Sequence, residues 1–457
     1  MATNSEHAPS SRTLTPPPEN SAQTDVDAKK QLASTVAVAE KGAAAGPPQG
    51  FTFPDGGWKA WSTVAGAWLV LFSSFGYVNA FGVYQEYYQQ YYLPNKTSSD
   101  ISWIGSFQLF LMFGLSAVTG KLHDEGYTKH LLVAGSVIYV ICIQMVSLAN
   151  QYYSIFLAQG LGMGIGIALV FVPAIGTLSH FFLKRRALAT GIVVSGSSIG
   201  GIVFPIMLNH LFKSVGFGWG VRASGFLILG CLVAGNLLIH TRLPPRKQRP
   251  AHMQFEPDMK GILTDVPYLI CNFGFFCVML GIFYPFFYLQ VFAAVHGVDE
   301  NLAFYCLSIL NAASVFGRVL PNFIADYLGP MNMLIPCIVI ASFFHWILLA
   351  CGSTAGIICF AIIFGFFSGA YISLLPAVQV GFARNVGEIG IRMGLPFIII
   401  SIAALVGSPI TGVLLGDGPD FHWWKASTFS GITGLTGCAL ITTARFMQAK
   451  RKGTQKV

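Results

Sequence analysis

Long stretches without a charged side chain follow one another along most of this sequence. Between residues 60 and 444, eight stretches have the length of one membrane-crossing helix, and two more, 130–183 and 327–383, are long enough for two helices each. Because a helix needs about 20 apolar residues to cross the hydrocarbon core, this spacing predicts twelve spans. The runs are continuously apolar and lack the alternation of a membrane barrel, so we expect an all-α membrane protein.

Composition and charge placement exclude several other classes. Hydrophobic residues make up 54% of the 457 positions and charged residues only 10%, against about 25% charged in soluble domains. The net charge of +8 lies in short clusters between apolar runs, which argues against a nucleic-acid binder. The nine cysteines lie inside apolar runs without metal-ligand spacing. We therefore expect no metal site, no cofactor and no disulfide framework.

The Lys and Arg residues predict the orientation of the chain in the membrane. With the N-terminus inside, the inner segments carry 22 of the 27 Lys and Arg residues, so both termini are expected in the cytosol. The chain's one Asn-x-Ser/Thr sequon, Asn95-Lys96-Thr97, then falls in the outer loop 86–100. This placement predicts glycosylation at Asn95.

The two halves of the chain repeat each other at an offset of 203 residues. Pro173-Ala174 recurs as Pro376-Ala377, and Gly191 recurs as Gly394. Six spans, a basic loop and six similar spans form the layout of a duplicated transporter. The expected segments are a disordered cytosolic tail at 1–53, a six-helix bundle at 54–240, a cytosolic loop at 241–264, a second six-helix bundle at 265–446 and a cytosolic tail at 447–457.

Three segments suggest a family. They are Asp55-Gly56-Gly57-Trp58-Lys59-Ala60-Trp61, the run from Phe181 to Ile192 (FFLKRRALATGI), and Phe217-Gly218-Trp219 followed by Arg222-Ala223-Ser224. They resemble the signature motifs of the monocarboxylate-porter family of the major facilitator superfamily, most closely its fungal branch. The loop from Gly120 to Gly126 is similar to the general facilitator gating motif. Over roughly 54–446, the resemblance implies a twelve-helix, two-bundle, alternating-access carrier.

We assign gating roles to residues of these motifs and to one carboxylate of the eighth span. These residues are Asp55, Gly56, Gly57, Trp58, Asp124, Arg185, Arg186 and Asp326. Simpler alternatives stay open. Asp55 could N-cap the first span, with Trp58 as an interfacial anchor. The basic run that includes Arg185 and Arg186 could be a topology signal that contacts lipid headgroups.

Arg318 is the only charged residue well inside a span. A central Arg costs roughly 2.5–3.5 kcal/mol on insertion scales, so it normally faces a cavity or a partner. In the animal carriers of the family, an Arg of the eighth span with an Asp one turn earlier is held to bind the substrate carboxylate. Here Ser314 occupies that earlier position, and Asn79 stands in the region where those carriers have a Lys. The alternative is that Arg318 pairs with Asp326 or with helix-end carbonyls.

The candidate substrate-binding residues are Arg318, Asn79, Tyr284 and Tyr371. The two tyrosines lie in the seventh and tenth spans, and Pro285 is expected to kink the seventh span and free carbonyls toward a cavity.

These features favour a secondary transporter in the membrane, most simply the plasma membrane. Its expected partners are the lipid bilayer and a small organic molecule, either a monocarboxylate-like anion or a fungal secondary metabolite, with efflux slightly preferred and proton coupling possible. The alternatives are proton-coupled uptake of a monocarboxylate or vitamin-like nutrient, and a nutrient sensor on a transporter fold. An enzyme is not expected, because the spans contain no nucleophile–base pair or di-acid. The sequence leaves open the substrate, the direction, the coupling ion and any accessory membrane subunit.

Overall fold

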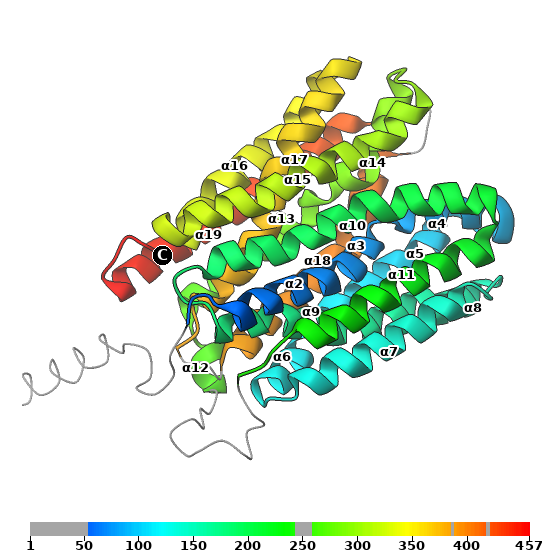
Figure 1. Ribbon diagram of the computed structural model, residues 1–457. Coiled ribbons are helices and arrows are strands. Elements are labelled where there is room, and N and C mark those ends of the chain that lie inside the picture. The colour runs from blue at the N-terminus through cyan, green and yellow to red at the C-terminus, as the bar shows by residue number, and fades with distance from the viewer. Residues whose placement is uncertain (1–53, 243–257, 385–387, 417–420) are drawn as a thin grey trace, which may run out of the picture. The chain divides into compact units, whose positions relative to one another are not determined.

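The structure, a computed structural model, describes residues 54–242, 258–384, 388–416 and 421–457. Within these ranges the secondary structure is helical and contains no strand, and the helices run alongside one another (Figure 1). The predicted tail 1–53 lies outside the described residues, as does most of the predicted loop 241–264.

The N-terminal half contains the first six membrane-crossing segments. Its helices are α2 (Trp58–Ser73), α3 (Phe75–Val78), α4 (Phe81–Tyr87), η1 (Tyr88–Tyr92), α5 (Ser98–Gly114), α6 (Ser116–Asp124), α7 (Thr128–Val146), α8 (Tyr152–Ile155), η2 (Phe156–Met163), α9 (Gly164–Gly176), η3 (Thr177–His180), α10 (Arg186–Ser214) and α11 (Phe217–Leu238). Here α2 packs against α10 and α11, while α9 packs against α5 and α7.

The C-terminal half repeats this arrangement after a short helix. Its helices are α12 (Met259–Leu263), α13 (Val266–Ile282), α14 (Tyr284–Val295), α15 (Glu300–Leu328), α16 (Pro330–Ile347), η6 (Leu348–Ala350), α17 (Thr354–Val380), α18 (Ile389–Leu415) and α19 (Trp423–Lys452). In this half α15 packs against α17, and α13 packs against α18 and α19. Across the halves, α10 packs against α15, and α18 packs against α5 and α6.

The number of long helices agrees with the sequence prediction. In the described ranges, 11 helical segments are long and apolar enough to cross a membrane. A twelfth, α19, spans 30 residues and packs against α13 and α16. It is less hydrophobic than the others because Gly, Ser and Thr recur along it. The expected all-α, twelve-helix fold is confirmed.

Two details refine the prediction. The seventh span breaks as expected, because α13 ends at Ile282 and α14 begins at Tyr284 with Pro285 in its first turn. The predicted C-terminal tail is partly helical, since α19 continues to Lys452. Beyond α19, the Val457 carbonyl oxygen accepts a hydrogen bond from the Met331 N–H at 3.0 Å.

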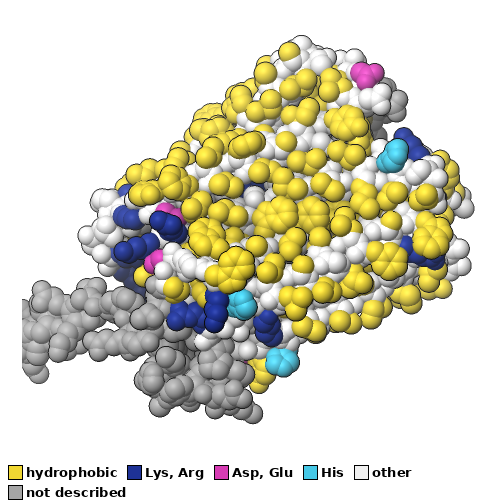
Figure 2. All heavy atoms as spheres, viewed as in Figure 1, with side chains coloured by type: hydrophobic (Ala, Val, Ile, Leu, Met, Phe, Trp, Pro, Cys, Tyr) yellow, Lys and Arg dark blue, Asp and Glu magenta, His cyan; other side chains and the backbone are white. Residues whose placement is uncertain are grey.

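The surface separates apolar and basic side chains. Hydrophobic side chains cover the middle of the visible face, and Lys and Arg gather at one end of it (Figure 2). This end, here called the basic end, is where α6 ends and where the C-terminus lies (Figure 1). A broad apolar surface bounded by such a basic cluster is the pattern expected of a protein that crosses a membrane with this end inside.

We expect Asn95 to carry an N-linked glycan in a eukaryotic host. Asn95 is exposed in the turn between η1 and α5. Endoglycosidase treatment should therefore lower the apparent mass of the wild type and leave Asn95→Gln unchanged. Asn95→Gln is a cleaner control than a change at Thr97, because the Thr97 hydroxyl accepts a hydrogen bond from the Asp100 N–H and caps α5. Cytosolic labelling of a cysteine placed at position 95 would contradict the topology.

Candidate functional site

One face of α15 carries a row of polar side chains along the contact between the two halves. They recur every three or four residues, which places them on one side of a helix. The row consists of Asn311, Ser314, Arg318, Asn322 and Asp326, four of which are buried. Because α10 packs along α15, this row forms a polar seam between the N-terminal and C-terminal halves.

Arg318 lies at the centre of the polar seam with only 2% of its surface exposed. Its Nη1 donates hydrogen bonds to the Val194 carbonyl oxygen at 2.8 Å and to the Ser197 hydroxyl, both on α10. Its Nε donates to the Ser314 hydroxyl at 3.1 Å. The guanidinium therefore joins the two halves directly.

Neither of the partners that the alternative named for Arg318 binds it. No carboxylate among the described residues forms a salt bridge with Arg318, and Asp326 binds elsewhere. The carbonyl that Arg318 does contact belongs to the middle of α10, not to a helix end. The result is a buried cation that has hydrogen-bond partners but no counter-ion in the described part of the chain.

Asn79, the C-cap residue of α3, lies beside the polar seam. Its Nδ2 donates to the Phe75 carbonyl oxygen at 3.2 Å and to the Ser197 carbonyl oxygen at 3.5 Å. Ser197 is thus shared between Asn79 and Arg318, and the structure brings these two predicted residues together. Nearby, the Asn311 Oδ1 atom is buried and has no hydrogen-bond partner among the described residues. An incoming polar ligand could bind to such an acceptor.

Tyr284 and Tyr371 lie elsewhere, inside the C-terminal half. The Tyr284 hydroxyl accepts from the Ser427 hydroxyl at 3.5 Å, and its ring packs on His345. The Tyr371 hydroxyl donates to the Phe275 carbonyl oxygen at 3.3 Å. Both side chains are at most 2% exposed. Their contact with substrate stays a prediction.

Two carboxylates join the halves at the basic end. The Asp326 oxygens accept hydrogen bonds from the backbone N–H groups of Ala187 and Leu188 at 2.9 and 3.0 Å, in the first turn of α10. The Asp124 oxygens accept from Gly390 and Ile391 at 2.8 and 2.9 Å, in the first turn of α18. Free N–H groups and the helix dipole make a helix N-terminus favourable for an anion.

These two contacts are related by the repeat seen in the sequence. The offset of 203 residues maps Ala187 and Leu188 onto Gly390 and Ile391, and Asp326 lies 202 residues after Asp124. The same type of cap therefore forms twice, once from each half to the other. We call the pair the carboxylate clasps.

Small residues let the backbones touch beside the carboxylate clasps. A Cβ added to Gly191 would lie 2.2 Å from the Arg318 carbonyl oxygen, and one added to Gly120 would lie 2.2 Å from the Gly390 carbonyl oxygen. The rings of Phe113 and Phe397 stack across the halves with centroids 5.4 Å apart. The two halves are in direct contact toward the basic end.

The motifs at the first and fifth spans meet in space. The Asp55 Oδ1 atom accepts from the backbone N–H groups of Leu183 and Lys184, both at 2.7 Å. The alternative that Asp55 caps the first span is wrong, because Gly57 is the N-cap of α2 and no side chain caps that helix. Asp55 instead holds the loop that leads into α10.

The remaining motif residues surround this loop. Gly56 precedes the N-cap of α2, and Trp58 begins α2 with 82% of its surface exposed. Arg185 is the exposed N-cap residue of α10. The Arg186 Nε donates to the Phe182 carbonyl oxygen at 3.2 Å. These positions link the loop to the clasp formed by Asp326.

Sequence reasoning missed a buried ionic network in the C-terminal half. Arg392, which is fully buried, donates from Nη1 to Asp265 at 3.1 Å and from Nε to Glu388 at 3.0 Å. Arg451 also donates to Asp265, at 3.1 Å. The sequence shows these residues only as charges near span ends. All four residues lie at helix ends that are predicted to be cytosolic. This shared location is the one signal in the sequence that could have suggested their pairing.

Asp326→Asn should loosen the first turn of α10. The change removes the negative charge and turns one acceptor into a donor that faces an N–H group. A favourable charge at a partly buried helix end contributes up to about 2 kcal/mol, so amide exchange at Ala187 and Leu188 should become about tenfold faster. Hydrogen-exchange mass spectrometry measures this rate.

Asp299→Asn is the matched control, because Asp299 caps its own helix by accepting from Asn301 and Leu302. It should leave exchange in α10 unchanged. Equal exchange of the α10 first turn in wild type and Asp326→Asn would contradict the clasp.

Comparisons with known proteins agree with this architecture. Residues 63–408 match the family model described as Major Facilitator Superfamily. The chain is 40% identical over 407 residues, covering 89% of this chain and 82% of the relative, to the aspyridones efflux protein apdF of Emericella nidulans. It is 39% identical over 430 residues, covering 93% and 95%, to the agnestins efflux protein AgnL12 of Paecilomyces divaricatus.

Solved structures show the same fold. The transporter FucP in its outward conformation aligns with a TM-score of 0.64 at 16% identity, over 84% of this chain and 98% of that one. The human organic anion transporter MFSD10 aligns with a TM-score of 0.63 at 12% identity, over the same shares. At such identities the likeness concerns the fold alone. From the family match, the relatives and the fold together, the chain belongs to the major facilitator superfamily.

Proposed function

We propose that this protein is a gradient-driven exporter of a small organic anion of the secondary-metabolite type, within the fungal branch of the monocarboxylate-porter family. Membership of the superfamily makes it a multi-pass membrane transporter and not an enzyme. Two relatives that are 40% and 39% identical are named as efflux proteins for aspyridones and agnestins. These names support efflux of a metabolite here.

Arg318 is the observation that carries the proposal of an anionic substrate. It is buried between the halves and is hydrogen-bonded to both, and it has no counter-ion among the described residues. A guanidinium can hold a carboxylate or phenolate with two parallel hydrogen bonds. We propose that Arg318 binds the substrate anion and that Asn79 adds a neutral donor beside it.

The carboxylate clasps supply the gate of an alternating-access cycle. The conformation described here has the two halves joined at the basic end by Asp124 and Asp326. For the substrate to enter from that side, both carboxylates must leave the helix N-termini and the Arg318 bonds to α10 must break. A substrate anion that accepts hydrogen bonds from Arg318 would replace the bonds from Arg318 to α10. We propose that substrate binding and gate opening are coupled in this way.

The topology follows from the basic end. We propose that this end lies in the cytosol together with both termini, in accordance with the positive-inside rule. We propose the plasma membrane as the location. Because the sequence contains no nucleotide-binding motif, we propose that a gradient, here of protons, drives transport. In this arrangement the described conformation is closed toward the cytosol.

Transport by purified protein in liposomes tests the proposal. We expect movement of a carboxylate- or phenolate-bearing metabolite that needs no ATP and that stops when an ionophore collapses the proton gradient. The Asp299→Asn protein should behave as wild type. ATP-dependent flux, or no flux of any organic anion across a metabolite panel, would contradict the proposal. Net uptake against the expected direction would favour the alternative of proton-coupled nutrient import.

A further inference from the structure

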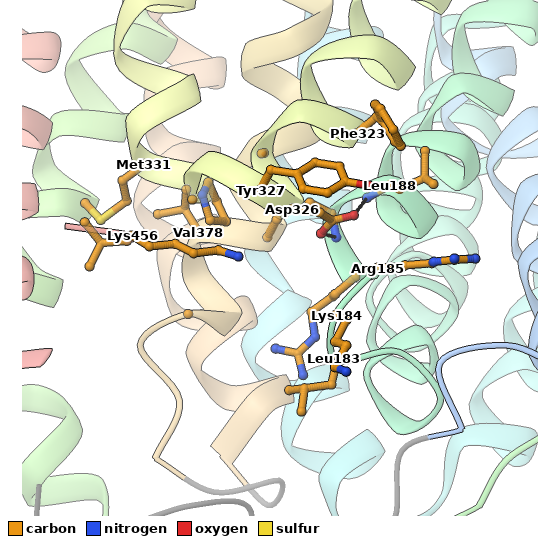
Figure 3. Close-up of a pocket in the computed structure, with 18 of the residues that line it drawn as sticks. Leu183, Lys184, Arg185, Leu188, Phe323, Asp326, Tyr327, Met331, Val378 and Lys456 are labelled. Atoms are coloured by element: carbon orange, nitrogen blue, oxygen red, sulfur yellow. Dashed lines mark hydrogen bonds between the residues drawn. The ribbon is translucent and has the colours of Figure 1, made fainter. Parts of the chain in front are cut away.

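A cavity of about 870 Å³ lies at the basic end, beside the clasp formed by Asp326 (Figure 3). The first turn of α10 forms one side, and the ends of α15 and α17, the start of α16 and the C-terminal segment form the other. Five basic residues line it, namely Lys184, Arg185, Arg186, Lys452 and Lys456. We call it the basic pocket. The transport cycle described above does not use it.

Among the described residues that line the basic pocket, basic side chains outnumber acidic ones. Asp326 is the one carboxylate-bearing side chain that lines the pocket, and its oxygens already accept two backbone N–H groups. Lys456 extends toward Asp326 in Figure 3. None of the five cations lies within salt-bridge distance of a described carboxylate. The pocket is therefore an electropositive site that favours an anion.

The basic pocket also has an apolar wall that opens onto the lipid-facing surface. Phe323 and Tyr327 of α15 line it, and they are 46% and 66% exposed. Leu183, which is 45% exposed, lines the other side. Tyrosine side chains such as that of Tyr327 are frequent at the level of the headgroups. A ligand that matches both walls has an anionic head and an apolar tail.

We propose that the basic pocket binds the phosphate-bearing headgroup of an anionic phospholipid from the leaflet at the basic end. The phosphate lies among Lys184, Lys452 and Lys456, and the acyl chains follow Phe323 and Tyr327 into the bilayer. Because the two walls come from different halves, the complete site exists only while the Asp326 clasp is closed. A ligand stabilises the conformation to which it binds better, so the lipid favours closure at the basic end.

Binding to nanodiscs tests the site without any transport measurement. The probe is fluorescent phosphatidylinositol 4-phosphate in phosphatidylcholine nanodiscs that hold the full chain. A basic residue near an anionic surface contributes about 1 kcal/mol, so the combined change Lys184→Gln, Lys452→Gln and Lys456→Gln should weaken binding by about 100-fold. The corresponding three Lys→Arg changes should retain binding and show that the protein is folded.

The control removes the same charge outside the pocket, through Lys213→Gln, Lys425→Gln and Lys450→Gln. Lys213 and Lys450 are exposed, and Lys425 is half-buried. This control should change the affinity by less than about threefold, because solvent-accessible charges away from the site are screened. If the pocket and control Lys→Gln variants lost equal affinity for the lipid, or if neither lost affinity, the proposal would be overturned. In wild type, the lipid should also slow amide exchange at Ala187 and Leu188, and no slowing would overturn the link to closure.

Competition with soluble inositol 1,4-bisphosphate distinguishes a lipid headgroup from a free phosphate ester as the ligand of the basic pocket. We expect this soluble ester to compete only weakly, because it lacks the tail that contacts Phe323 and Tyr327. Competition as effective as that of the whole lipid would show that the pocket takes a free phosphate ester, and the lipid assignment would be wrong.

Discussion

Arg318→Lys should reduce transport of an anionic substrate by about 100-fold, while the protein still folds and reaches the membrane. In the proposed complex the guanidinium replaces its bonds to Val194 and Ser197 with two parallel hydrogen bonds to the substrate anion, and a lysine ammonium cannot reproduce this fork. Hydrogen bonds to charged groups contribute about 1.5–3 kcal/mol each, so loss of one or two accounts for an effect of this size. Initial rates in proteoliposomes measure it.

Arg222→Lys controls for the effect of replacing a hydrogen-bonded arginine by lysine. Arg222 donates from Nε to the Ser147 hydroxyl at 3.1 Å, but both residues belong to the N-terminal half. This variant should retain transport within about threefold, because its bond lies outside the polar seam. Normal flux of an anion by a well-folded Arg318→Ala protein would contradict a binding role for Arg318. A loss of expression or thermal stability in Arg318→Lys, with normal flux by the surviving protein, would show that the residue is structural.

Gly191→Ala should prevent full closure at the basic end. Its Cβ would lie 2.2 Å from the Arg318 carbonyl oxygen and 2.8 Å from the Asn322 Cβ, far inside ordinary contact distances. Since the clash is with backbone, α10 and α15 must separate. Overpacking of this kind costs about 1–3 kcal/mol, so the closed conformation should lose roughly tenfold or more in population. Faster amide exchange in the first turn of α10 and a matching fall in transport would report this shift.

Gly230→Ala provides the comparison, because a Cβ at this helical position meets no other atom within 4 Å. Alanine also has the higher helix propensity, so this variant should be neutral or slightly more stable. Equal exchange and equal transport in Gly191→Ala and wild type would contradict the close packing of α10 on α15.

The sequence predicted the features that depend on local composition. Apolar length alone located the spans, and the repeat placed Gly191 and Gly394 at corresponding points of the two halves. In the structure, Gly191 lies against α15, and Gly394 lies against Ser116 of α6. Intramembrane charge alone drew attention to Arg318, because a lone buried cation is costly unless something binds it.

The partners of the charged groups could not be predicted in the same way. Asp124 and Asp326 bind backbone N–H groups, which every residue except proline has and which no side-chain pattern marks. Asp55 could be interpreted as a helix cap because it precedes a helix in the sequence. In the structure it instead binds a loop 128 residues away. The buried network around Arg392 depends on which helix ends meet, and that is decided by the tertiary packing.

The central claim is that Arg318 binds the negative charge of the substrate. Equilibrium binding of one transported carboxylate and of its uncharged methyl ester, each to wild type and to Arg318→Lys, tests this most directly. We predict that the substitution weakens binding of the acid by at least about tenfold more than binding of the ester, a coupling of about 1.4 kcal/mol. Equal losses for the acid and the ester would contradict the claim.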